Sequence, residues 1–380
     1  MTGNGKPNSK LRRLVRIACS IASLAVLTYI TVSLISGRGL GLSRFSGLFS
    51  KSEPVETADD YFFDVGRGRT FADLGGALAA AGTQGIQILD AGGAETLRDP
   101  YLMSTPAMNA REGRAVAFDI GGFSVRAFDR SGIISSFETD DAIINASINR
   151  NGWFCVCTRE GGGFKGAVDV YNGSGAEVYR VNMANGYVLS AELSPDNLKL
   201  AVLTLTDNGS RVTFFSLDSE TADHSYDLYG GLIIDISYRA DGTLLAVSTG
   251  ALIVIDRDGA GRELCGFSGA ILSGYAIGSD YIALHLLDYG VGYRGRMIAL
   301  GLNGDLLGEI STDREIISIA VGADIAVLRN DGLSIFSRNF TEYPVSGAPG
   351  STAGATRVIA LGDGSVLAAG DHSAVVIRFE

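Results

Sequence analysis

One pattern recurs along the chain from residue 61 to the end, with a period of about 41 residues. Each unit reads as an apolar strand, a turn, a strand of small and β-branched residues, a loop, a third strand, and a fourth strand after a glycine turn. The third strands are expected to end at Asp90, Asp129, Asn172, Asp218, Asp256, Asn303, Ser337 and Phe379. Four antiparallel strands at this spacing are typical of a propeller blade. The sequence predicts an all-β, eight-bladed β-propeller, with seven blades as the alternative.

Glycine accounts for 51 of the 380 residues, and much of this excess falls in the turns of the repeat. Asn-Gly or Asp-Gly pairs occur at Asn151, Asn208, Asn303, Asp331 and Asp363. Such pairs accept the positive φ angles of two-residue hairpin turns. The second strands, such as ALAAAG and LLAVST, are rich in small residues, which fits strands crowded round a central channel.

The two ends of the repeat predict how the ring closes. The last unit supplies only three strands before Glu380, and Tyr61–Val65 precedes the first unit as a spare strand. We expect this segment to complete the last blade as its outer strand, because closure removes the exposed strand edges that promote aggregation.

A short turn and a longer stretch carry a family resemblance. The segment Ser194-Pro195-Asp196-Asn197 resembles the S-P-D-G turn of Tol-type and WD-like bacterial propellers. Residues 142–217 are similar to the bacterial domain-of-unknown-function family 5711, and the likeness covers nearly the whole chain. The resemblance implies an N-terminal membrane helix followed by an eight-bladed propeller. This chain has Tyr179 and Leu264 where the family usually has tryptophan, and the resemblance brings no functional residues.

The N-terminal region predicts a membrane anchor. Ile17 to Ser36 contains no charged residue and is long enough to span the hydrocarbon layer as a helix. A cleaved signal peptide is the alternative, but its apolar region is shorter and ends in a small-x-small site. The basic flanks place the N-terminus in the cytoplasm. We therefore expect a tail at 1–16, a transmembrane helix at 17–36, a linker at 37–60 and a propeller at 61–380 outside a bacterial cell membrane.

The charges divide unevenly along the chain. Residues 1–51 hold eight basic and no acidic residues, which leaves 23 basic against 42 acidic residues in the rest. An acidic body repels phosphate backbones, so nucleic acid is not an expected partner.

No residue pattern indicates a catalytic, cofactor-binding or metal site. The histidines at 224, 285 and 372 lack metal-ligand spacing with any other histidine or cysteine. Cys155 and Cys157 alternate along a strand and are expected to be small buried hydrophobic side chains. A disulfide between them would be strained. We predict no cofactor.

Three loops between second and third strands are long, at Arg159–Gly166, Asp207–Arg211 and Asp288–Arg296. In a propeller these loops share one face with the connections between blades. Aromatic and arginine side chains on loops are common anchors of recognition. The candidate partner-binding residues are Arg159, Phe164, Lys165, Tyr289, Tyr293, Arg294 and Arg296.

These features favour a membrane-anchored, extracytoplasmic propeller that binds or scaffolds a protein or envelope component without catalysis. The alternative is an enzyme that uses the propeller channel, either an envelope hydrolase or a quinoprotein-like dehydrogenase. The single Trp153 argues against the quinoprotein class, whose propellers display repeated tryptophan motifs. A hydrolase would need acidic or histidine side chains converging on the channel, and an apolar channel would count against it.

Overall fold

The computed structural model describes residues 57–159, 162–290, 292–344 and 352–379. The expected tail, the transmembrane segment at 17–36 and nearly all of the linker lie outside these residues. Within the described ranges, no helix has the length and apolar character needed to cross a membrane.

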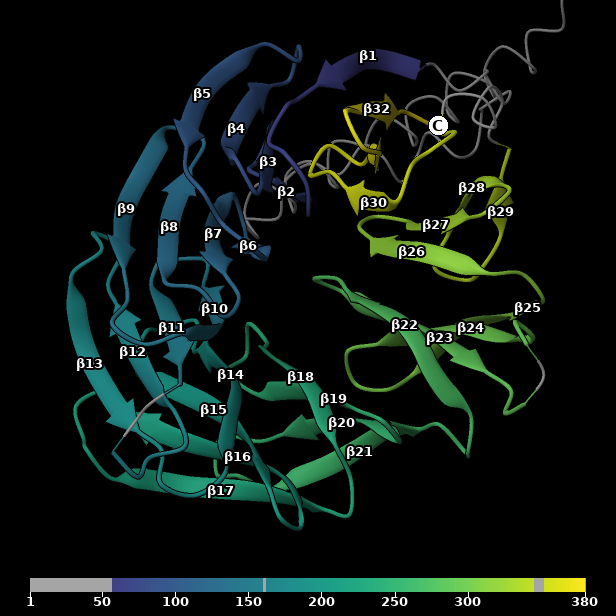
Figure 1. Cartoon of the computed structure of the whole chain (residues 1–380). Coiled ribbons are helices and arrows are strands. Elements are labelled where there is room, and N and C mark those ends of the chain that lie inside the picture. The colour runs from purple at the N-terminus through teal and green to yellow at the C-terminus, as the bar shows by residue number, and fades with distance from the viewer. Residues whose placement is uncertain (1–56, 160–161, 291, 345–351, 380) are drawn as a thin grey trace, which may run out of the picture. The chain divides into compact units, whose positions relative to one another are not determined.

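The described chain forms eight four-stranded antiparallel sheets arranged round an axis, which confirms the eight-bladed propeller (Figure 1). Each blade follows the order of the sequence from its first strand outward. Blade 1 contains β2 (Thr70–Asp73), β3 (Ala77–Gly82), β4 (Gly85–Asp90) and β5 (Glu95–Pro100). Blade 2 contains β6 (Pro106–Arg111), β7 (Arg114–Asp119), β8 (Ser124–Asp129) and β9 (Gly132–Glu138). Blade 3 contains β10 (Ile143–Ile148), β11 (Phe154–Thr158), β12 (Ala167–Tyr171) and β13 (Glu177–Asn182). Blade 4 contains β14 (Tyr187–Leu193), β15 (Lys199–Thr206), β16 (Gly209–Ser216) and β17 (Ala222–Tyr229).

The second half of the ring repeats the same plan. Blade 5 contains β18 (Ile233–Tyr238), β19 (Leu244–Ser248), β20 (Ala251–Ile255) and β21 (Gly261–Gly266). Blade 6 contains β22 (Ile271–Ile277), β23 (Tyr281–Leu287), β24 (Gly295–Gly301) and β25 (Leu306–Thr312). Blade 7 contains β26 (Ile316–Val321), β27 (Ile325–Arg329), β28 (Gly332–Phe336) and β29 (Glu342–Tyr343). Blade 8 contains β30 (Arg357–Ala360), β31 (Val366–Ala369), β32 (Ser373–Ile377) and, as its outer strand, β1 (Thr57–Phe62). The third strands end within two residues of every position that the repeat predicts.

The hydrophobic core consists of eight clusters, one at each interface between neighbouring blades. Strand β11 shows how the alternation of side chains builds two of them. Cys155 and Cys157 pack toward blade 4, whereas Phe154 and Val156 pack toward blade 2. Both cysteines are buried and free, as the sequence indicates. A blade therefore has no core of its own and depends on both neighbours.

The radial order of the strands corrects one expectation. The small-residue second strands are not innermost: the first strand is one edge of each sheet, and Figure 1 shows that this edge faces the axis of the ring. The second strands are instead buried on both sides between blades, as in β19, where every residue from Leu244 to Ser248 is buried. Small residues there allow the blades to approach closely. The channel wall is formed by the first strands, which carry more polar residues.

The turns also differ in one detail from the expectation. At Asn151-Gly152, Asn303-Gly304 and Asp363-Gly364, only the glycine has a positive φ, with 80° at Gly152 and 95° at Gly304. The Gly152 amide donates to the Asn149 carbonyl, and the Asn149 amide donates to the Trp153 carbonyl. This pattern is a three-residue hairpin with a left-handed glycine rather than a two-residue turn.

Two faces can be defined from the connections. The loop face holds the connections between second and third strands and those between blades. The turn face holds the connections between first and second strands and between third and fourth strands. Thr57, where the described chain enters the propeller, pairs with Ile377 at the end of β32, so it lies at the turn face.

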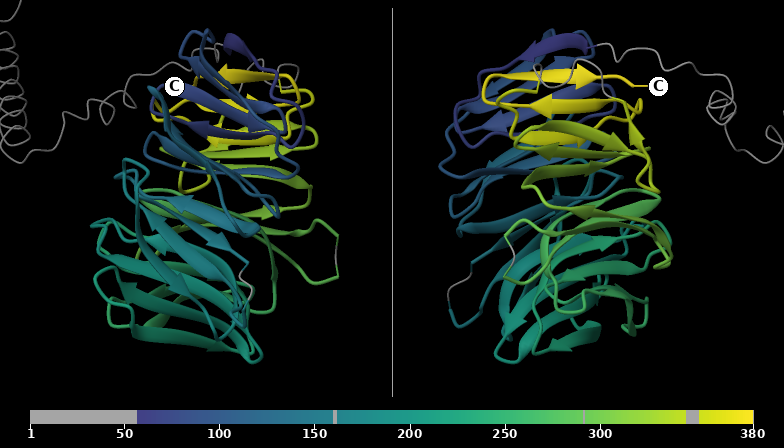
Figure 2. Two further views of the ribbon diagram at one scale, coloured as in Figure 1. Left: turned by 60° about the vertical axis from the view of Figure 1, so that its left-hand side comes forward. Right: turned by 90° about the vertical axis from the view of Figure 1, so that its right-hand side faces the viewer.

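Ring closure occurs as the sequence predicts, although the closing strand begins at Thr57 rather than Tyr61. Strand β1 pairs with β32 along its length, and Figure 2 shows β1, in purple, beside the yellow strands of blade 8. The Phe63 amide donates to the His372 carbonyl at 3.2 Å. Arg69 of the segment after β1 forms an ion pair with Asp371 at 2.8 Å. Tyr61, Phe63 and Val65 are buried in the cluster between blades 8 and 1.

A chain that starts at residue 63 lacks β1 and should aggregate, because the edge of β32 and the cluster between blades 8 and 1 become exposed. We expect its melting temperature to fall by at least about 5 °C, since losing one buried aromatic side chain alone costs about 3–5 kcal/mol. Size-exclusion chromatography and thermal melts test this against a control chain that starts at residue 57 and keeps β1. Two monodisperse chains with equal melting temperatures would contradict the closure.

Candidate functional site

The predicted loop of blade 3 is exposed at the loop face. Arg159 follows β11 and is exposed, and the Phe164 side chain is 41% exposed. The Lys165 ammonium lies 4.5 Å from the ring centre of Tyr187, the first residue of β14. This cation–π contact ties the loop of blade 3 to blade 4.

The predicted loop of blade 6 is exposed as well. The side chains of Tyr289 and Tyr293 are 80% and 50% exposed. Arg294 forms an exposed ion pair with Asp288 at 3.1 Å. Arg296 lies within β24, where its guanidinium is 3.8 Å from the carboxylate of Glu309.

The structure does not bring the two predicted loops together, because blades 4 and 5 lie between blades 3 and 6 in the ring (Figure 1). The third predicted loop, Asp207–Arg211 in blade 4, is not a long loop. Strands β15 and β16 extend so far that only two residues separate them, and Arg211 lies in β16, paired with Asp227 at 2.7 Å.

Exposed apolar side chains gather on the loop face well beyond the predicted residues. Among the described residues, all but three of the strongly exposed large apolar side chains lie at loop-face ends of strands or in loop-face connections. They are Phe62, Leu102, Ile120, Phe123, Phe164, Tyr187, Leu205, Tyr229, Leu232, Ile234, Ile271, Tyr289, Tyr293 and Ile317. The exceptions are Val178, Leu198 and Leu306, at the turn-face side. The loop face therefore exposes more large apolar side chains than the turn face.

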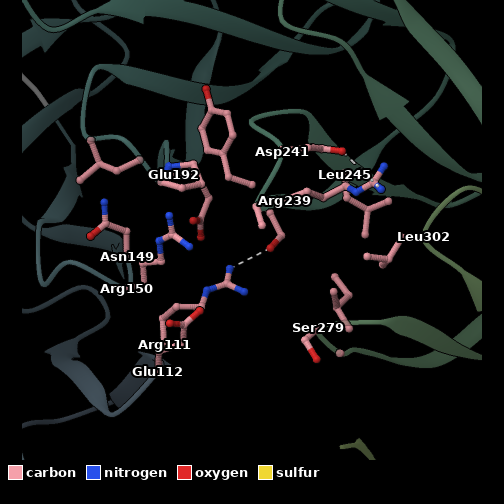
Figure 3. Close-up of a pocket in the computed structure, with 17 residues that line it drawn as sticks. Arg111, Glu112, Asn149, Arg150, Glu192, Arg239, Asp241, Leu245, Ser279 and Leu302 are labelled. Atoms are coloured by element: carbon pink, nitrogen blue, oxygen red, sulfur yellow. Dashed lines mark hydrogen bonds and ion pairs between the residues drawn. The ribbon is translucent and has the colours of Figure 1, made fainter. Parts of the chain in front are cut away.

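A second candidate site lies in the channel. A cavity of about 430 Å³ opens among the turns of blades 2 to 6 at the turn face. It continues into a chamber of about 270 Å³ between the first strands of the same blades, since both are lined by Arg111, Glu192, Ser237 and Ile277. Figure 3 shows Arg111 and Glu192 extending into the outer cavity.

A recurring irregularity in the first strands places polar side chains along this wall. The register shifts near the start of the first strand in blades 3 to 7. After the shift, Asn145, Ser190 and Asp235 occupy equivalent positions in blades 3, 4 and 5. Ser147, Glu192 and Ser237 follow two residues later, on the same side of each strand. Three neighbouring blades thus present two rows of polar groups.

Two hydrogen bonds link the first strands of different blades inside the channel. The Arg111 Nη2 of blade 2 donates to the Ser237 Oγ of blade 5 at 2.8 Å. The Tyr275 hydroxyl of blade 6 donates to the Asp235 Oδ2 of blade 5 at 3.0 Å. Burial raises the pKa of Asp235, although the bond from Tyr275 opposes this rise. These contacts hold two charged side chains at fixed places in the chamber.

Glu192 is the most perturbed carboxyl group of the channel. Burial raises its pKa to about 8, with a further increase from Asp235, while the nearby Arg111 guanidinium acts in the opposite direction. Within the described part of the chain, no side chain or amide donates a hydrogen bond to this carboxyl group. Strongly shifted groups in cavities often mark functional sites.

The remaining chemistry-bearing side chains lie elsewhere. His285 is buried with its Nε2 3.2 Å from the Thr312 hydroxyl, and burial lowers its pKa. Burial raises the pKa of the Cys155 thiol to about 12. Across the ranges that the structure describes, no three histidine, cysteine or acidic side chains are close enough to hold a metal ion.

The pKa of Glu192 predicts how stability depends on pH. Between its ordinary value of 4.5 and about 8, the folded protein holds a proton that the unfolded chain has lost. The free energy of unfolding should therefore fall as pH rises through this window, by on the order of 1 kcal/mol per pH unit from this group. Glu192→Gln should remove that decline, and denaturant unfolding at pH 5, 6.5 and 8 measures it.

Glu112→Gln is the matched control, because Glu112 is an exposed carboxylate on the rim of the same cavity. If Glu192→Gln and wild type lose stability in parallel as pH rises, Glu192 is not a buried, protonated group.

Comparisons with known proteins identify structures with a similar fold and assign the family. BamB from Moraxella catarrhalis has a similar structure, with a TM-score of 0.55 and 16% identity over 86% of this chain and 100% of that chain. The C-terminal WD40 domain of Sif2 has a TM-score of 0.60 and 12% identity over 87% and 100%. At these identities the likeness establishes the fold alone. No curated protein matches the sequence. A family model described as a family of unknown function, DUF5711, matches residues 52–341, and the chain belongs to this family.

Proposed function

We propose that this chain is a membrane-anchored, extracytoplasmic propeller whose loop face docks a protein partner. The observation that carries the proposal is the gathering of exposed apolar and aromatic side chains on that face. Monomeric soluble proteins seldom expose large apolar areas, and such areas commonly mark interaction sites. Tyrosine is also enriched at interfaces, and the loop face presents Tyr187, Tyr229, Tyr289 and Tyr293.

The place where the chain enters the ring agrees with this role. Thr57 lies at the turn face, so an anchor joined there leaves the loop face at the far end of the propeller from its attachment point. The charge-free run at 17–36 and its basic flanks support the anchor and a cytoplasmic N-terminus. The two predicted loops then contribute separate parts of one docking face, at blades 3 and 6.

An envelope hydrolase is the second candidate. A hydrolase needs acidic side chains that converge on the channel, and Glu192 and Asp235 do so. Nucleophilic catalysis also needs a nucleophile hydrogen-bonded to a base. In the described channel, Asp235 instead accepts from Tyr275, and this arrangement favours binding over hydrolysis.

The docking face is tested by in vivo crosslinking and affinity capture of the full-length protein from membranes. The variant Tyr289→Ala/Tyr293→Ala/Arg294→Ala should lose at least one partner that wild type retains, by roughly tenfold in yield, because truncated anchor residues typically cost 1–2 kcal/mol or more. A second variant, Phe164→Ala/Lys165→Ala, tests the blade 3 patch.

The matched control is Leu198→Ala/Leu306→Ala, which removes exposed apolar side chains from the turn-face side. It should capture the same partners as wild type. The proposal fails if both loop-face variants keep the full partner set, or if only the control loses it.

The anchor has its own test. Two arginines at the centre of the run, in Leu24→Arg/Leu27→Arg, should move the protein out of the carbonate-washed membrane fraction, since each costs about 2.5–3.5 kcal/mol of insertion. Leu24→Ala/Leu27→Ala should stay in that fraction.

The side of the membrane is tested separately. Protease added outside spheroplasts should digest the wild-type propeller. Protection from the protease, or membrane retention of the arginine variant, would contradict the proposal.

A further inference from the structure

The channel chamber is unrelated to the loop face and has a composition of its own. Its polar wall carries the carboxyl groups of Glu192 and Asp235 against one guanidinium, that of Arg111. Arg111 already donates to Ser237, and Asp235 accepts from Tyr275. When both carboxyl groups are ionised, one negative charge in the chamber is left without a balancing cation.

Two groups in the chamber have unused hydrogen-bonding capacity. The Ser190 hydroxyl is buried and has no hydrogen-bond partner among the described residues. The Glu192 carboxyl group receives no hydrogen bond from the same part of the chain. Both belong to β14 and line the chamber two residues apart, on the same side of the strand. A buried hydroxyl without a partner is costly, so the Ser190 Oγ points to a ligand that pairs with it.

The outer cavity continues this polar chamber with apolar side chains. Leu245, Ile277 and Leu302 line it, and Tyr238 adds an aromatic ring. A ligand that fills both parts therefore has a polar cationic end and an apolar body. The combined space suits a small molecule, because small-molecule sites commonly measure about 300–1,000 Å³.

We propose that this channel binds a small primary amine, with the ammonium group between Glu192, Asp235 and Ser190 and the apolar body against Leu245, Ile277 and Leu302. An ammonium group has three donors and no acceptor, which matches the two carboxyl groups and the free hydroxyl. An anionic ligand would instead bring a third negative charge beside the two carboxyl groups. A hard divalent cation would bind to oxygen ligands alone and would leave the apolar side chains of the outer cavity without a partner.

Binding should release a proton. In the empty channel, the raised pKa of Glu192, about 8, keeps most of its carboxyl group protonated at pH 7. The titratable groups that interact with it are Arg111 from β6, Asp235 and Tyr238 from β18, and the thiols of Cys155 and Cys157 from β11. An ammonium ion stabilises the carboxylate form, so its binding displaces the proton. Affinity should therefore increase with pH up to about 8, by at most about tenfold per pH unit.

The experiment is isothermal titration calorimetry on the full-length protein in detergent, with hexylamine as the probe. Hexan-1-ol and hexanoate are the neutral and anionic counterparts of the same length. We expect hexylamine to bind saturably and the other two to bind at least about tenfold more weakly. The heat should depend on the ionisation enthalpy of the buffer at pH 6.5, which reports proton release.

The variants separate a site from adventitious uptake into detergent. Glu192→Gln should weaken hexylamine binding at least about tenfold and abolish proton release, and Asp235→Asn provides an independent second variant. Glu112→Gln, on the exposed rim, should bind like wild type. The proposal is overturned if hexylamine gives no saturable heat with wild type, if hexan-1-ol or hexanoate binds equally well, or if both channel variants bind hexylamine as wild type does.

A zwitterionic probe, 6-aminohexanoate, adds information on the rim, where Arg150 and Arg239 line the outer cavity. Binding tighter than that of hexylamine would extend the proposal to ligands with an amine and a carboxylate. If 6-aminohexanoate binds as weakly as hexanoate and hexylamine also fails to bind, the proposal of an amine site is overturned.

Discussion

The pairing of β1 with β32 is the interaction on which the rest of the structure depends. Each hydrophobic cluster lies between two blades, so no blade is stable without both neighbours. An unclosed ring would leave blade 8 short of its outer strand and the cluster between blades 8 and 1 partly open. The same pairing makes the described chain enter the propeller at the turn face.

The closed ring also explains why its surfaces have different chemistry. Second strands contact a blade on either side, so most of their residues are buried. First strands contact neighbours but also border the channel, so they can carry Asn145, Ser190, Glu192 and Asp235. Arg111 and Ser237, which are distant in sequence, meet only because the ring returns blade 5 toward blade 2. The two ends of the channel then serve different purposes in our proposal, with a partner at the loop face and a small amine entering from the turn face.

The blades could be predicted closely from the sequence, because the alternation of apolar residues and the glycine turns recur in every unit. Asp90 and Asp129 end third strands at the predicted residues, and the closing strand was displaced by only a few residues.

The channel site could not be predicted, because the small residues of the second strands suggested that these line the channel. Once the first strands are known to be innermost, the alternating polar pairs Ser190 with Glu192 and Asp235 with Ser237 do indicate a polar channel wall. The contact of Arg111 with Ser237 depends on the curvature of the ring and has no signal in the sequence. The predicted loop residues Phe164 and Tyr289 are exposed as expected, but their separation in the ring follows only from the blade order.

Hydrogen exchange followed by mass spectrometry tests the closure most directly, because it reports how tightly each strand is held in the intact protein. Amide protons of β1 that bond to β32 should exchange only through unfolding of the ring, at rates similar to those of β32 itself. Peptides covering residues 57–62 and 373–377 should therefore show comparable protection. If the β1 amides exchange within seconds while β32 and the inner strands stay protected, the ring is not closed by this strand.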